Sequence, residues 1–122
     1  MHTNLYYMPP KKALKYLLDV EQLIAELEAL VSICERDYFL FNSNFMALRT
    51  AERNLELIGE AIRQMYAAAP EITINNAKDI IGLRNLLAHA YDNIDATALW
   101  KILIKDLPSL KAEVQEQIRR FS

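Results

Sequence analysis

Three side chains within one eight-residue run have the chemistry needed to act on a phosphodiester. Arg84 supplies a planar fork of N–H donors that fits a phosphate, His89 can exchange a proton near neutral pH, and Tyr91 offers a nucleophilic or modifiable hydroxyl. On an RNA backbone the 2′-hydroxyl could attack the adjacent phosphate, with His89 as the base and Arg84 stabilising charge on the phosphoryl oxygens. Asn85, one helical turn before His89, could orient the imidazole or donate to a phosphate oxygen. This transesterification needs no metal ion.

The spacing of Arg84 and His89 raises a geometric question. On an ideal α-helix, side chains five positions apart project about 140° from each other, so these two would not share a face. Three arrangements could bring them together: the arginine curls toward the helix end, the last turn loosens before Asp92-Asn93, or a second copy of the chain supplies the complementary residue. The third arrangement predicts a symmetric dimer with the two runs facing each other across a cleft.

Taken singly, each of these side chains also has an ordinary structural interpretation. A histidine near a helix C-terminus is favoured by the helix dipole. Arg84 could form a salt bridge with Asp79 or Glu60, and Tyr91 could be a half-buried packing residue. The run alone therefore leaves catalytic and structural interpretations open.

The composition predicts one helical domain over residues 1–122. Apolar residues make up 52% of the chain, enough for one core, and two glycines and four prolines are few breakers, which favours helices over a sheet. A net charge of −2 and a pI near 5.7 lack the basic excess with which many proteins hold long nucleic acids. The single cysteine, Cys34, excludes an internal disulfide and disfavours a cysteine-based zinc site. No apolar run reaches the roughly 18 residues of a membrane span, so we expect a cytoplasmic protein. We also expect the protein to need no metal or cofactor of its own.

Apolar residues recur at three-and-four spacing along most of the chain, which predicts an antiparallel bundle of about five helices, two of them long. The repeat is unbroken in the second long helix, as expected of a helix packed nearly antiparallel against another. That seam comprises Leu48, Ala51, Leu55, Ile58, Ile62 and Met65. The stripe of the first long helix contains one polar residue, Glu21. The predicted segments are an extended arm over 1–10 and helices over 11–35, from a cap at Asn42 or Ser43 to 68, over 77–90, from a cap at Asp95 to 105, and from Pro108 onward.

A charged stripe accompanies the seam of the second long helix. Its members are Arg49, Arg53, Glu56, Glu60 and Arg63. Their spacing favours a solvated face with ion pairs three or four residues apart, although Arg53 or Glu60 could help line a cleft. Aromatic residues such as Phe39 and Trp100 are interpreted as packing or dimer contacts, because no cluster of lysine and arginine interleaves with them.

Two blocks of the sequence resemble the HEPN superfamily, and more closely the HepT-type toxins of HEPN–nucleotidyltransferase toxin–antitoxin modules. The first block is RNLELIGEA at residues 53–61, and the second is DIIGLRNLLAHAY at residues 79–91. Leu99-Trp100 and Asp106-Leu107-Pro108 follow in the same order. The resemblance covers roughly Phe45 to the C-terminus, and the R-x4-H-x-Y core gains specificity from its order with the other block and the Leu-Pro junction.

The resemblance implies an all-α, HEPN-like bundle that forms a homodimer and joins two R-x4-H motifs in one cleft. It also implies a metal-independent endoribonuclease toxin that cleaves RNA, often tRNA in relatives. Arg84 and His89 would be catalytic with support from Asn85, and a cognate nucleotidyltransferase antitoxin of the MNT type would use ATP to adenylylate Tyr91. A dimer cleft that concentrates Arg84, Arg53 and Lys78 would supply the grip on RNA that an acidic pI does not.

Two rival interpretations belong to other functional classes. The first is a noncatalytic HEPN module that binds nucleotides or serves as a scaffold for a nucleotidyltransferase; it predicts tight binding without RNA cleavage. The second is a plain helical interaction domain, in which replacing His89 changes stability and no activity.

Overall fold

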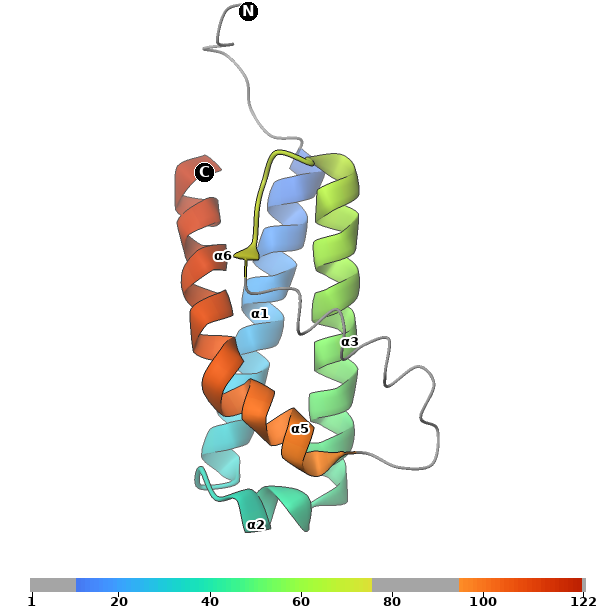
Figure 1. The fold of residues 1–122 in the computed structure, drawn as a ribbon, viewed down its shortest axis with the longest axis vertical. Helices are drawn as coiled ribbons and strands as arrows, with labels where there is room; N and C mark the ends of the chain where they lie inside the picture. The colour runs from blue at the N-terminus through green and yellow to red at the C-terminus, as the bar shows by residue number, and fades with distance from the viewer. Residues whose placement is uncertain (1–10, 76–94, 122) are drawn as a thin grey trace, which may run out of the picture.

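The computed structural model describes residues 11–75 and 95–121, and within these ranges every regular element is a helix. Three long helices, α1 (Lys11–Ile33), α3 (Phe45–Ala68) and α6 (Leu107–Phe121), stand side by side, with α1 antiparallel to the other two (Figure 1). The short helix α2 (Tyr38–Asn42) joins α1 to α3, and α5 (Ala96–Lys101) packs against α2 and α3 at the same end of the bundle. The predicted all-α fold is therefore confirmed.

The seam between α1 and α3 forms the centre of the core. On α3 every predicted seam residue is buried except Leu48, which is half-buried. On α1 the prediction needs a correction, because the buried position near the middle is Val20 and not Glu21, which lies at the edge of the interface. The polar interruption therefore disappears: Leu17 and Ile24 are buried, and the buried position between them lies one residue earlier than predicted, which keeps the Glu21 carboxylate near water.

The connection between the two long helices differs from the prediction. Asn44 caps α3, with its Oδ1 accepting from the N–H of Ala47 at 3.0 Å, where Asn42 or Ser43 was predicted. The residues before it form α2, whose first turn is capped by Asp37 through bonds to the N–H groups of Phe39 and Leu40 at 2.8 and 3.2 Å. A helix of five residues is too short to show a periodic apolar pattern, which is why the sequence did not reveal it.

The C-terminal third of the described chain is one continuous helical run. Asp95 caps α5 as predicted, with its Oδ1 accepting from the N–H of Ala98 at 3.0 Å. The predicted break before Pro108 is wrong, because a π-helical stretch, η2 (Ile102–Asp106), carries the chain directly into α6. Proline lacks an N–H and crowds the carbonyl one turn back, and the wider π turn gives its ring room.

Two predicted segments, the arm over 1–10 and the helix over 77–90, lie outside the described residues. In the described ranges, no helix combines the length and the apolarity required to cross a membrane.

Candidate functional site

The residues predicted to carry the chemistry fall mostly outside the part of the chain that the structure describes. Arg84, Asn85, His89, Tyr91 and Lys78 all belong to residues 76–94. Arg53 and Glu60 are described, and both lie on α3. The structure therefore describes the residues that precede and follow residues 76–94, together with the helices of the bundle.

The described residues on either side of residues 76–94 are hydrogen bonded to helices. At the first end, the N–H of Asn75 donates to Glu113 Oε2 on α6 at 2.7 Å, and the Tyr66 hydroxyl of α3 bonds both the N–H and the carbonyl of Ile74. At the second end, Asp95 caps α5, whose Thr97 hydroxyl lies 3.0 Å from the Tyr38 hydroxyl of α2. In Figure 1 the described chain stops beside the middle of the bundle and resumes at the end that carries α2.

The charged stripe on α3 is largely a solvated face, as predicted. Arg63 pairs with Glu60 at 3.8 Å, and Arg49 pairs at 3.3 Å with Glu52, which is not a member of the predicted stripe. Arg53 is exposed. Glu60 is seven positions after Arg53, so the two share a face of α3 about 10 Å apart along its axis.

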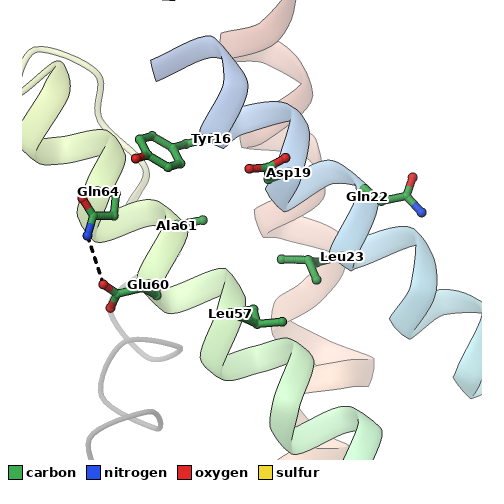
Figure 2. A pocket seen from close by; sticks show the side chains of 8 residues that line it. All are labelled: Tyr16, Asp19, Gln22, Leu23, Leu57, Glu60, Ala61 and Gln64. Carbon is green, nitrogen blue, oxygen red and sulfur yellow. Dashed lines mark hydrogen bonds between the residues drawn. The ribbon is translucent and has the colours of Figure 1, made fainter. Parts of the chain in front are cut away.

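Glu60 forms part of the wall of a cavity of about 360 Å³ between α1 and α3. Figure 2 shows Leu23 and Leu57 pointing toward each other across it, and Gln64 Nε2 donating to Glu60 Oε1 at 3.1 Å. The lining residues are Tyr16, Asp19, Gln22, Leu23, Leu57, Glu60, Ala61 and Gln64. This set holds two carboxylates and no cation, so by itself it suits an apolar group better than a phosphate. Arg53 does not line it, and the structure does not bring Arg53 and Glu60 into one cleft.

Asn54 is a buried polar residue of α3 that the sequence interpretation did not single out. It is the buried polar residue of the described core, 6% exposed, and its Nδ2 donates to Glu26 Oε1 at 3.0 Å and to the Leu23 carbonyl at 3.4 Å. These bonds fix the rotation of α3 against α1, because a buried amide loses its partners if the helix turns. Asn54 thereby sets the direction in which its neighbour Arg53 faces solvent. The signal in the sequence was an asparagine directly beside the seam residue Leu55.

The titratable groups of the described core offer no nucleophile. Cys34 is buried, and desolvation raises the pKa of its thiol, so the thiolate required for attack is disfavoured. Cys34 is therefore a small residue of the hydrophobic core. Over residues 11–75 and 95–121, no cluster of three or more His, Cys, Asp or Glu side chains could hold a metal ion.

Comparisons with known proteins place the chain in a family. The family model described as Ribonuclease HepT-like matches residues 20–117. A protein of Methanocaldococcus jannaschii named as an RNase is 42% identical over 80 residues, which cover 65% of this chain and 73% of that protein. A protein of Thermococcus cleftensis named as a ribonuclease HepT is 31% identical over 106 residues, covering 83% of this chain and 91% of that protein.

A third relative extends the comparison to another organism. It is a protein of Caldanaerobacter subterraneus named as an RNase, 27% identical over 109 residues and covering 83% of this chain and 92% of that protein. No solved structure matches the chain. Because the family model spans α3, the whole R-x4-H-x-Y run and most of α6, the chain belongs to the ribonuclease HepT-like family of the HEPN superfamily.

Proposed function

We propose that the chain is a metal-independent endoribonuclease toxin that cuts RNA with the side chains of Arg84 and His89. The observation that carries the proposal is that the R-x4-H-x-Y run lies inside the span matched by the ribonuclease family model. The names of the relatives from three organisms, each given as an RNase, support the same activity. tRNA is the substrate class that we would test first.

The proposed cleavage is an internal transesterification. His89 takes the proton of a ribose 2′-hydroxyl, whose oxygen attacks the adjacent phosphorus while the bond to the 5′ oxygen breaks. The leaving 5′ oxygen takes a proton from imidazolium or water, and the products are a 2′,3′-cyclic phosphate and a 5′-hydroxyl. Arg84 stabilises the charge that develops on the phosphoryl oxygens, and Asn85 orients the imidazole. In this proposal a second copy of the chain completes the cleft.

The neutralising reaction is proposed for Tyr91. Its hydroxyl attacks the α-phosphate of ATP in the active site of a partner nucleotidyltransferase, which releases pyrophosphate and leaves AMP on the tyrosine. Each AMP adds bulk and a phosphodiester negative charge two residues from His89, so an RNA phosphate is both blocked and repelled. The helical scaffold needs no unfolding for this control.

The nuclease proposal is tested by incubating the purified chain with bulk RNA in EDTA. We expect cleavage by the wild type, and losses of about 10²- to 10⁴-fold in His89→Ala and about 10²- to 10³-fold in Arg84→Ala, the ranges for a general base and a charge-stabilising donor. His2→Ala is the matched control because it removes the other histidine of the chain. Equal cleavage by the wild type and both motif variants would assign the activity to a contaminant. Tight binding of a nucleotidyltransferase without cleavage would favour the scaffold interpretation.

The modification proposal is tested by mass spectrometry after incubation with ATP and the partner enzyme. We expect mass increases in AMP-sized steps, abolished in Tyr91→Phe and retained in Tyr38→Phe, whose hydroxyl contacts Thr97. Label that persists in Tyr91→Phe would move the modification to another residue.

A further inference from the structure

Most of the large apolar side chains that face solvent gather at one end of the bundle. Seven such side chains are exposed in the described ranges, and five of them lie between residues 33 and 46. These five form what we call the α2 patch: Ile33, Phe39, Leu40, Phe45 and Met46, with Phe39 78% exposed and Ile33 and Met46 73% exposed. Exposed apolar side chains that occur singly need no explanation, whereas a contiguous group marks an interaction surface.

The members of the patch surround a hollow. Ile33, Leu40, Phe45 and Met46 line a depression of about 480 Å³, with the polar residues Ser43 and Asn44 between them. Phe39 stands beside Leu40 on the same short helix, α2. The patch thus combines an exposed phenyl ring with a depression large enough to receive one.

The backbone holds these side chains outward through defined contacts. Glu35 and Arg36 have positive φ angles of 56° and 52°, and the N–H groups of Arg36 and Glu35 donate to the carbonyls of Val31 and Ser32, which ends α1 in a Schellman motif. A non-glycine residue in this conformation costs roughly 1 kcal/mol, and glycine is the usual residue there. The surrounding contacts must therefore hold the turn in this conformation. Phe41, fully buried beside Trp100, fixes the other side of α2. The exposure of Phe39 and Leu40 is therefore imposed by the fold.

We propose that the α2 patch is the surface through which two copies of this chain pair about a two-fold axis. With large side chains of about 150–250 Å² each, the exposed fractions leave roughly 600 Å² of apolar surface per copy, close to the about 800 Å² per partner of a stable interface. The charges beside the patch complement each other. Glu35 lines the hollow, while the Arg49 guanidinium, which also pairs with Glu52 of its own chain at 3.3 Å, lies over the Phe45 ring, 5.0 Å from its centroid. In the pairing that we propose, Arg49 of one copy would face Glu35 of the other at two symmetry-related contacts.

This inference rests on the proposed function and adds to it the face that makes the dimer. The α2 patch occupies the end of the bundle where α5 begins, since Tyr38 contacts both Thr97 and Trp100. The run at 84–91 is joined to the cap of α5 by three residues. Pairing through the α2 patch would therefore bring together the bundle ends of the two copies. In each copy this is the end where α5 begins, to which residues 84–91 are connected in the sequence.

The first test compares oligomeric state across matched charge insertions. Native mass spectrometry and analytical ultracentrifugation of the full chain should show a dimer for the wild type. Phe39→Glu and Met46→Glu should each raise the dimer dissociation constant by about 30-fold or more, as for a central anchor residue. Leu18→Glu is the control, because Leu18 is 46% exposed on α1 away from the patch and the inserted charge is the same. A monomeric wild type, or patch variants that pair as tightly as the control, would overturn the proposal.

The second test keeps the patch itself intact and exchanges the two charges beside it. Arg49→Glu and Glu35→Arg should each pair poorly with themselves, because like charges then face each other at both contacts. In a mixture of the two variants both contacts are restored, so the mixed dimer should greatly exceed the half expected from random pairing. Random pairing in the mixture would contradict the proposed two-fold arrangement.

Activity measurements separate this inference from the nuclease proposal. A dimer that depends on the α2 patch but does not cut RNA would refute the nuclease and support the interface. RNA cleavage by a dimer that tolerates both patch variants would refute the interface and support the nuclease.

Discussion

The α1/α3 seam and the α2 end contain the same kinds of apolar side chain in opposite environments. In the seam, Leu27, Leu55 and Ile58 are no more than 1% exposed. At the α2 end, Phe39 and Met46 face solvent although the backbone around them is firmly hydrogen bonded. The comparison separates two uses of apolar residues: those of the seam stabilise the chain itself, and we infer that those of the α2 end stabilise its pairing.

The largest effect expected from this comparison is on the free energy of unfolding of seam variants. Ile58→Ala should lower it by about 2–5 kcal/mol, because truncating a fully buried side chain leaves a cavity. Phe39→Ala should change it by less than about 0.5 kcal/mol. Both are measured by urea unfolding at fixed protein concentration in the Met46→Glu background, so that pairing does not add to stability. Equal losses in the two variants would contradict the division between seam and patch.

A smaller effect is expected at the polar contact that fixes the seam. Asn54→Ala should lower the free energy of unfolding by about 1–2 kcal/mol, because a buried amide loses its hydrogen bonds to α1. Gln22→Ala is the matched control, since Gln22 also donates to Glu26, at 3.4 Å, but is exposed. Denaturant unfolding gives both values, and a loss in Gln22→Ala as large as that in Asn54→Ala would contradict the role of burial.

The smallest effect is a gain in stability at the turn before α2. Glu35→Gly should raise the free energy of unfolding by about 0.5–1 kcal/mol, since glycine takes the positive φ without steric cost. Ala29→Gly, at an exposed position inside α1, should lower it by a similar amount, because glycine weakens a helix interior. Thermal and urea unfolding of the two variants should therefore differ in sign. A loss in both would mean that the Glu35 side chain stabilises the turn more than its backbone conformation costs.

The long helices could be predicted from the sequence because burial repeats with the period of the helix. The six seam residues of α3 show that period without a miss, and five of them are fully buried. The register of α1 was harder, since a one-residue shift separates Val20 from Glu21 and both choices fit three-and-four spacing. The turn at Glu35 could not be predicted because it places non-glycine residues at positive φ, and α2 could not because five residues are too short to show a periodic pattern. The π stretch was missed because Pro108 inside a continuous helical run has the same signature as a helix start.

The candidate site, like the fold, could be predicted only in part from the sequence. The sequence suggested that Glu60 could help line a cleft, and Glu60 lines a cavity between α1 and α3 whose walls contain no cation to bind a phosphate. The sequence also suggested Arg53 for a cleft, but where Arg53 points depends on the rotation of α3, which Asn54 sets through its bonds to α1. The reacting residues lie outside the described ranges, so their geometry remains a prediction.

The π stretch at Ile102–Asp106 sets the rotation of α6 relative to α5, and these two helices contact the residues that follow and precede residues 76–94. Each residue added to or removed from a helix turns everything beyond it by about 100°. Shortening η2 by one residue would swing Glu113 away from Asn75 and Lys111 away from Glu28, while Asp95 at the start of α5 stayed in place. The one extra residue in the π turn thus allows Glu113 to bond Asn75 while Asp95 caps α5.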